Sequence, residues 1–220
     1  MRLSILTPTL SNRAEYASKL FASIHRQYQG GDLGQEIVPH LTEPVHYVHR
    51  FMFGNDVELI FDEDKGHSRG GVTVGEKRQR LLNSARGEYV AFCDDDDAVS
   101  GDYVYEILKA IRENPGVDAI TFEQRAYFDG VYGKVEFGHA VNEEWSPERV
   151  TKRMVWHVCA IRREIALQST FPAVNWGEDW RWLEPLQSLI KTKVHIPKEL
   201  HEYHYRTEVS EAKADESSSG

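Results

Sequence analysis

Short apolar runs alternate with segments of helical periodicity along the first half of the chain. Apolar and aromatic runs bounded by glycine, proline or polar residues predict buried strands at Leu3–Thr9, Val57–Phe61, Tyr89–Cys93 and Val117–Phe122. Apolar residues at helical spacing predict helices between them at Ala17–Ile24, Val74–Ala85 and Val104–Ile111. This alternation indicates an α/β fold with a mostly parallel central sheet, right-handed crossovers and flanking helices.

Local signals predict where several of these elements begin and end. Asn12, followed three residues on by Glu15, has the pattern of a helix N-cap. Gly87 is expected to close the second helix, and Asn114-Pro115-Gly116 the third. Residues 32–55 show no regular pattern and are expected to be irregular.

The second half of the chain predicts a mixed arrangement. Arg125–Phe137 has the pattern of a hairpin that turns at Asp129-Gly130 or at Tyr132-Gly133. His201–Arg206 alternates as an edge strand does, with its imidazoles on one face. Further strands are predicted at Met154–Ile161 and Lys193–Ile196.

Four consecutive aspartates, Asp94–Asp97, follow the predicted strand that ends at Cys93. Ligands bind outside the carboxyl ends of strands in open α/β sheets. Carboxylates packed this closely repel one another and lose hydration, and a divalent cation relieves both effects because hard metals prefer carboxylate oxygens. An acidic surface turn is the alternative interpretation.

Charged residues also gather after the strand that ends at Phe61. Acidic residues follow it directly, namely Asp62, Glu63 and Asp64. Carboxylates at the C-terminal ends of both strands are expected if the two ends line one site. The alternative is a solvated turn, and for Glu63 alone this alternative is preferred. Three basic residues on the next helix either meet a diphosphate or form an exposed polar face: Lys77, Arg78 and Arg80.

Two carboxylates lie between indoles in Trp176–Trp182, where a helix is expected to begin. A carboxylate against aromatic walls can have its pKa raised and serve as a general base, so Glu178 and Asp179 are candidate bases. Helix capping is the competing interpretation.

The histidines give weaker signals than the carboxylates. Three of them lie in the irregular segment at spacings that fit no standard metal site, and we expect them to be solvated: His40, His46 and His49. His201 and His204 are either metal ligands or residues of a surface strand.

Composition narrows the possible function classes. The chain has 220 residues, of which 40 % are hydrophobic, enough for one domain with a real core. A net charge of −9 disfavours sequence-blind binding to nucleic acid or to an anionic membrane. Cys93 and Cys159 lie in apolar runs and are expected to be core residues. With no signal peptide and no membrane-length apolar run, we expect a cytoplasmic protein.

Taken together, these motifs resemble the inverting, nucleotide-sugar glycosyltransferases of family 2, which have the GT-A fold. The motifs that carry the resemblance are Thr7-Pro8, Lys77-Arg78-Gln79 with Ala85, Gly87-Glu88-Tyr89, Asp94-Asp95-Asp96 and Gly177-Glu178-Asp179. The chain departs from the family at Gln79, where asparagine is usual, and in a longer connection over residues 30–55. His204 also precedes Tyr205-Arg206, whereas the family's late histidine follows that motif.

The resemblance implies a Rossmann-like GT-A domain over residues 1–211, followed by a disordered tail at 212–220. Residues 1–122 would bind the donor and residues 123–211 the acceptor. It implies transfer from a nucleoside diphosphate sugar with Mn²⁺ or Mg²⁺, and UDP is favoured because it is the commonest donor nucleotide in the family.

The resemblance also implies roles for individual residues. Asp179 would be the base, with Glu178 as the second candidate. The metal would be held by Asp96, Asp94 and His204. Donor contacts are expected from Thr7, Pro8, Asp62, Asp64, Arg78, Asp94 and Asp95.

Two other classes remain alternatives to glycosyl transfer. A nucleotidylyltransferase also places carboxylates and a metal at strand ends, but the glycine-rich phosphate loop with lysine is missing after Thr7. A non-catalytic sugar-nucleotide or cation-binding module has no need of the Glu178-Asp179 pair. The acceptor stays open among a saccharide, a protein hydroxyl, a small metabolite and a modified nucleobase.

Overall fold

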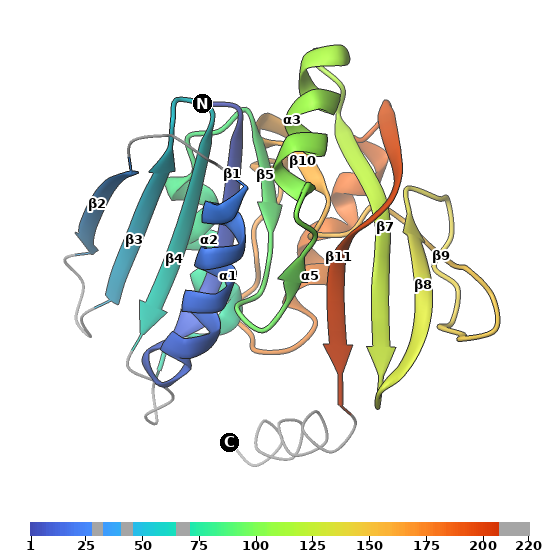
Figure 1. The fold of residues 1–220 in the computed structure, drawn as a ribbon, viewed down its shortest axis with the longest axis horizontal. Helices are drawn as coiled ribbons and strands as arrows, with labels where there is room; N and C mark the ends of the chain where they lie inside the picture. The colour runs from blue at the N-terminus through green and yellow to red at the C-terminus, as the bar shows by residue number, and fades with distance from the viewer. Residues whose placement is uncertain (28–32, 41–45, 65–70, 207–220) are drawn as a thin grey trace.

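A computed structural model describes residues 1–27, 33–40, 46–64 and 71–206, which fold around one mixed sheet of 11 strands (Figure 1). The strands are β1 (Leu3–Leu10), β2 (Leu33–His40), β3 (His46–Phe53), β4 (Val57–Asp64), β5 (Tyr89–Phe92), β6 (Ala98–Val99), β7 (Ala119–Phe128), β8 (Val131–Phe137), β9 (Thr151–Arg153), β10 (Ala160–Arg162) and β11 (Lys193–Tyr205). Their order is β2-β3-β4-β1-β5-β10-β7-β11-β6, with β8 beside β7 and β9 beside β8. The predicted tail at 212–220 lies outside the described residues.

Strands β4, β1 and β5 form the parallel part of the sheet that the sequence predicts. Leu6 of β1 is in register with Ile60 of β4 and with Phe92 of β5. The carboxyl ends of these three strands therefore meet at one edge of the sheet. Strand β10 runs antiparallel between β5 and β7, so the second half is mixed, as predicted.

Helices cover both faces of the sheet. In Figure 1, α1 (Ala14–Arg26) and α3 (Tyr103–Glu113) lie in front of it, and α2 (Val74–Ser84) and α5 (Glu178–Leu183) lie behind it. On the rear face, the Phe92 ring packs edge-on against Phe171 and Trp182, with centroids 5.3 and 5.7 Å apart. Shorter helical segments are η1 (Ser11–Arg13), α4 (Arg163–Ala166) and η2 (Pro185–Ser188).

Helix α2 begins at a capping box. The Thr73 hydroxyl accepts from the Glu76 backbone N–H, and the Glu76 carboxylate accepts from the Thr73 N–H, which satisfies two donors that the helix leaves free. The helix ends at Ser84, so the prediction that Gly87 closes it is wrong. Gly87 instead lies where a Cβ would be 2.6 Å from the backbone nitrogen of Ser4, and only glycine allows that approach.

Three other local predictions are also wrong. The described part of residues 32–55 is not irregular, because β2 and β3 pair antiparallel and extend the sheet beyond β4. Asn12 caps no helix, since it lies within η1 and α1 follows from Arg13 without a side-chain cap. The predicted strand Met154–Ile161 reduces to Ala160–Arg162, the stretch that pairs with β5 and β7. In the two corrections that concern strands, long-range pairing decides the structure, and local propensity does not report it.

The long strand β11 corrects the interpretation of the late histidines. It lies between β7 and β6, so His201 is not on an edge strand. His201 and His204 are three residues apart and therefore point to opposite sides of the strand. The hairpin before it turns at Asp129-Gly130 with φ of 48° and 83°, which confirms the first of the two predicted turns.

The buried core contains both cysteines, Cys93 and Cys159, as predicted, and neither is in a disulfide. In the part of the chain that the structure describes, no helix combines the length and apolar character that crossing a membrane requires.

Candidate active site

The aspartate run lies at the carboxyl edge of β5, beside the end of β1. Asp95 is buried, and its Oδ2 accepts a hydrogen bond from the Thr9 hydroxyl at 2.6 Å. Burial raises the pKa of Asp95 to about 6, although the Thr9 hydrogen bond and the charge of Arg13 act in the opposite direction. One nitrogen of Arg13 lies 2.8 Å from Asp95 and 2.7 Å from Asp96, so a guanidinium already compensates part of the run.

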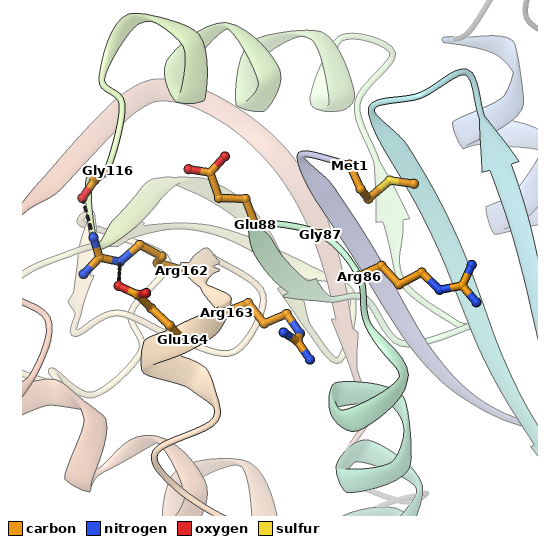
Figure 2. A pocket seen from close by; sticks show the side chains of 8 residues that line it. All are labelled: Met1, Arg86, Gly87, Glu88, Gly116, Arg162, Arg163 and Glu164. Atoms are coloured by element: carbon orange, nitrogen blue, oxygen red, sulfur yellow. Dashed lines mark hydrogen bonds and ion pairs between the residues drawn. The ribbon is translucent and has the colours of Figure 1, made fainter.

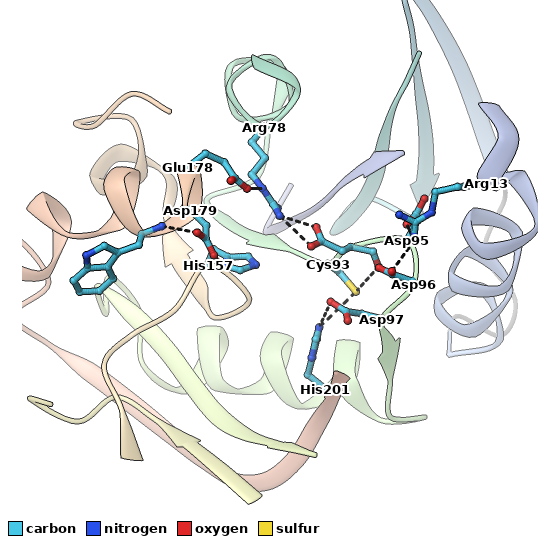
Figure 3. A network of polar contacts seen from close by, with 12 residues as sticks. Arg13, Arg78, Cys93, Asp95, Asp96, Asp97, His157, Glu178, Asp179 and His201 are labelled. Carbon is cyan, nitrogen blue, oxygen red and sulfur yellow. Dashed lines mark hydrogen bonds and ion pairs between the residues drawn. The ribbon is translucent and has the colours of Figure 1, made fainter. Parts of the chain in front are cut away.

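Arg78 joins the aspartates to the second acidic pair. From α2 it reaches the carboxylate of Asp94 at 2.9 and 3.0 Å through Nη2, and its Nε donates to Glu178 Oε1 at 3.1 Å (Figure 3). The Arg78 side chain is only 4 % exposed. Burial opposes its charge, but Asp94 and then Glu178 outweigh burial and raise the pKa of Arg78. Arg78 and Glu178 are 100 residues apart, so this contact brings the two halves of the chain together.

The basic face of α2 is therefore not an exposed polar surface at Lys77 or Arg78. Both residues are buried, and Lys77 Nζ donates to the carbonyl of Thr9 at 2.9 Å. Arg80 binds the fully buried Asp62 through two hydrogen bonds of 2.7 and 3.0 Å. The alternative interpretation of a solvated turn after Phe61 therefore does not apply to Asp62.

Helix α5 begins with the two candidate bases. Gly177 precedes it with φ of 70°, a left-handed conformation that favours glycine. The side chain of Glu178 is 7 % exposed and held by Arg78, whereas that of Asp179 is 23 % exposed. Asp179 Oδ1 accepts from the Trp180 backbone N–H at 2.7 Å, and its Oδ2 lies 3.3 Å from His157 Nδ1. Of the pair, Asp179 is thus the carboxylate that a substrate can reach.

The expected rise in the proton affinity of this pair is wrong for Asp179. Burial by itself would raise its pKa, but the contact with His157 and the charge of Arg78 outweigh burial and lower the pKa below the usual range. The expected rise in pKa rested only on the indoles that neighbour Asp179 in the sequence, whereas the contact with His157 forms only in the fold. His157 lies in the segment that was predicted as a strand, and its type and spacing gave no signal.

The predicted metal ligands Asp94, Asp96 and His204 do not converge as one group in the described part of the chain. The Asp96 side chain is 50 % exposed, and Asp97 is paired with the buried His201 at 3.3 Å. His204 hydrogen-bonds Glu202 and stacks on Tyr127, with no contact to the aspartates. His201 is therefore the late histidine that the structure brings to the acidic run.

This donor set fits a divalent cation that is bound together with a diphosphate. Within the described residues no three histidine, cysteine or acidic side chains already converge as a cage. Mg²⁺ and similar ions use one or two carboxylates plus substrate phosphates, and keep several waters. Asp96 presents an exposed carboxylate, and its present partner, Arg13, is itself a cation.

The predicted donor contacts lie at the same edge, on β1 and β4. Thr7 is buried, and its hydroxyl has no hydrogen-bond partner in the described part of the chain. Pro8 follows it and is in register with Asp62. The side chain of Asp64 lies outside the described residues.

A cavity of about 480 Å³ lies at the opposite edge of the sheet, where β1 and β5 begin and β10 ends (Figure 2). Its lining contains none of the predicted site residues and consists of Met1, Arg86, Gly87, Glu88, Gly116, Arg162, Arg163 and Glu164. We place the candidate active site at the carboxyl edge, because the carboxylates and their cations converge there.

A mixed sheet with helices on both faces and an acidic run at the carboxyl end of β5 is the architecture of GT-A glycosyltransferases. The model of the family described as Glycosyl transferase family 2 matches residues 67–171, which include the aspartate run. The predicted resemblance to a GT-A glycosyltransferase of this type is confirmed, and so is the fold class.

Solved structures of S. aureus TarS have a similar fold. TarS matches with a TM-score of 0.61 and 16 % identity over 93 % of this chain and 37 % of that one. TarS 1–349 in complex with UDP-GlcNAc matches with a TM-score of 0.61 and 16 % identity, over 94 % of this chain and 59 % of that one. TarS 1–349 in complex with UDP matches with a TM-score of 0.60 and 15 % identity, over 93 % of this chain and 60 % of that one. The chain thus spans less than two thirds of these proteins. A comparison with curated proteins found no match in sequence.

Proposed function

We propose that this protein is a metal-dependent, inverting glycosyltransferase that moves a sugar from a UDP-sugar to an acceptor hydroxyl. The family match and the GT-A fold support glycosyl transfer. The similar TarS structures in complex with UDP-GlcNAc and with UDP support a UDP-sugar as the donor.

The contact of Arg78 with both Asp94 and Glu178 carries the proposal. Sugar transfer needs a place for the diphosphate and, across the sugar ring, a base for the acceptor. Arg78 holds the aspartate run of β5 next to the start of α5, so both requirements are met at one site.

Asp179 is the proposed base, because its side chain is more exposed than that of Glu178, which is held by Arg78. Its lowered pKa leaves it ionised, and therefore able to accept a proton, at neutral pH. The acceptor oxygen forms a bond to the anomeric carbon as its proton passes to the Asp179 carboxylate. The bond from that carbon to the diphosphate oxygen breaks, and its electron pair leaves with UDP. Attack on the face opposite the leaving group inverts the anomeric centre.

Asp96 is the proposed metal ligand, because its side chain is the most exposed of the four in the run Asp94–Asp97. When bound, Mn²⁺ or Mg²⁺ would neutralise charge on the departing diphosphate. Arg13 would then give up one of its two carboxylates. Metal binding by His204 stays a prediction, and so do the acceptor, the division into donor and acceptor halves, and the cytoplasmic location.

The test is calorimetric titration of UDP with and without Mn²⁺, followed by an assay of UDP release from UDP-sugars. Asp96→Asn should retain the fold but lose most of the Mn²⁺-dependent UDP affinity, whereas Asp56→Asn, at an exposed turn, should retain it. Asp179→Asn should bind donor normally and lower turnover by roughly 100-fold or more, on general-base magnitudes.

Each other outcome points to a different function. Unchanged Mn²⁺-dependent binding in Asp96→Asn would remove Asp96 from the metal site. Tight UDP binding without release from any UDP-sugar would support a binding module. Synthesis of a nucleotide sugar from a nucleoside triphosphate would support nucleotidylyl transfer. A clear thermal-shift preference for GDP or dTDP over UDP would overturn the choice of donor.

A further inference from the structure

His157 is held from several sides beside the proposed base. It lies in the loop between β9 and β10 and is 8 % exposed. Its backbone carbonyl accepts a hydrogen bond from the Phe92 N–H at 3.0 Å, which ties the loop to β5. Its ring lies edge-on to Phe92, with centroids 6.4 Å apart, and next to Trp156 at 5.9 Å. The ring therefore has little freedom to turn.

The two oxygens of Asp179 have different partners. Oδ1 accepts the Trp180 backbone N–H at 2.7 Å, so that oxygen is fixed by the start of α5 itself. Oδ2 lies 3.3 Å from His157 Nδ1 (Figure 3). No other described side chain forms an ion pair with Asp179, so the rotation of its carboxylate depends on His157.

The charged groups around His157 favour a proton on Nδ1. The carboxylates of Asp179 and Asp94 interact with it electrostatically, and Arg78 and Glu178 lie in the same network. A nitrogen lone pair facing Oδ2 would repel the ionised carboxylate, whereas an N–H at Nδ1 donates to it. Arg78 is bound to Glu178 through Nε and to Asp94 through Nη2, and it forms no ion pair with Asp179 in the described part of the chain.

We propose that His157 is a positioning residue: its buried Nδ1, which has no other partner in the described part of the chain and lies 3.3 Å from Asp179 Oδ2, donates to that oxygen and holds the carboxylate turned toward the acceptor. This role rests on the proposed function, since it assigns Asp179 as the base. His157 takes no part in bond exchange. The acceptor proton passes to Asp179 as the new glycosidic bond forms, and it is released to solvent after UDP leaves.

A matched set of variants separates positioning from packing. His157→Ala removes the donor and the ring. His157→Asn places an amide N–H near the position of Nδ1, without the imidazole ring. His139→Gln, at a histidine paired with Glu136 far from the site, is the control. The assay is UDP release from a UDP-sugar in Mn²⁺.

His157→Ala should lower kcat by roughly 10- to 100-fold, a part of the effect of a general base, and leave the KM for the donor unchanged. His157→Asn should recover most of that loss, and His139→Gln should match wild type. Because His157 lowers the pKa of Asp179, its removal should raise that pKa and move the acidic limb of kcat/KM to higher pH. A packing role would reduce the amount of active enzyme without moving the limb.

A second measurement does not depend on activity. In ¹⁵N-edited NMR of the histidine rings, the His157 signals are identified among ten histidines by their loss in His157→Asn. Nδ1 should carry a proton in wild type, and Asp179→Asn should shift its resonance more than Glu178→Gln does. An unprotonated Nδ1, or equal kcat in His157→Ala and wild type, would overturn the proposal.

The two failures can be told apart. A wild-type protein that releases no UDP from any UDP-sugar, with Nδ1 protonated and sensitive to Asp179, contradicts the proposed function and removes the reaction that His157 would serve. An active wild type with an unprotonated Nδ1 contradicts only the role of His157.

Discussion

Arg78→Met should show how strongly the two halves of the site depend on one buried cation. Methionine preserves much of the volume and the helix propensity of arginine but leaves the carboxylates of Asp94 and Glu178 without their partner. Glu178 is 7 % exposed, so water cannot replace the lost hydrogen bonds. Removing one member of a buried ion pair costs about 3–5 kcal/mol. Since Asp94 is partly exposed, we expect the lower end of that range.

A loss of about 3 kcal/mol corresponds to a fall in Tm of roughly 6–12 °C for a chain of this size. The loss should depend on pH with a definite sign. Burial raises the pKa of Asp94 in the native protein, but Arg78 outweighs burial and lowers it, so this stabilisation is present above the unfolded carboxylate pKa of about 4. It disappears as the pH falls through the folded pKa. The difference between Arg78→Met and wild type should therefore keep its full size from pH 7 down to about pH 5 and shrink only below about pH 4.

Urea unfolding at pH 7 and pH 3 measures both effects. Arg112→Met, at an exposed position of α3, is the control and should stay within about 0.5 kcal/mol of wild type. Adding Glu178→Gln to Arg78→Met removes one uncompensated charge and should recover part of the loss, with a coupling energy of about 0.5–3 kcal/mol. An Arg78→Met variant as stable as the control, or a double variant that recovers nothing, would refute the electrostatic argument.

Two further substitutions test contacts outside the site. Gly75→Ala should destabilise the protein by at least about 1–3 kcal/mol, since a Cβ would lie 1.9 Å from the Pro172 carbonyl oxygen. The control is Gly101→Ala, which has open space around it and should be near neutral in the same thermal scan. Asp118→Asn should cost about 1–3 kcal/mol at pH 7, because this carboxylate accepts two backbone N–H groups just before β11 and pairs with Arg162. Burial by itself would raise the pKa of Asp118, but these hydrogen bonds outweigh burial and lower the pKa in the folded protein. The cost of Asp118→Asn should therefore shrink below about pH 4, and an unchanged cost at low pH would contradict the assignment.

Elements with strong local signals could be predicted from the sequence. The buried run Tyr89–Phe92, the amphipathic α3 and the Asp129-Gly130 turn each depend on residues close together in the chain. The antiparallel pair of β2 and β3 could not be predicted, because its strands are specified by pairing with the edge of β4 and not by an alternating pattern of their own.

The acidic motifs could be found in the sequence, but their electrostatic environment could not. Trp176 and Trp180 flank the acidic pair in the sequence and suggested an apolar pocket. The fold instead places His157 against Asp179 and Arg78 against Glu178, and both contacts join residues far apart in the chain. A pKa depends on distances of a few ångströms, so the sign of its shift followed from the fold and not from the sequence neighbours.

The same comparison changes the reason for expecting a metal ion. From the sequence alone, a cation was required because adjacent aspartates at a strand end repel one another. In the folded protein Arg13 pairs with Asp95 and Asp96, and Arg78 with Asp94, so arginines already provide much of that compensation. The need for Mn²⁺ or Mg²⁺ therefore shifts from the fold to the substrate, since a diphosphate brings further negative charge to a site where Arg78 already pairs with Asp94 and Glu178. On this argument a metal ion should matter much more for donor binding than for folding.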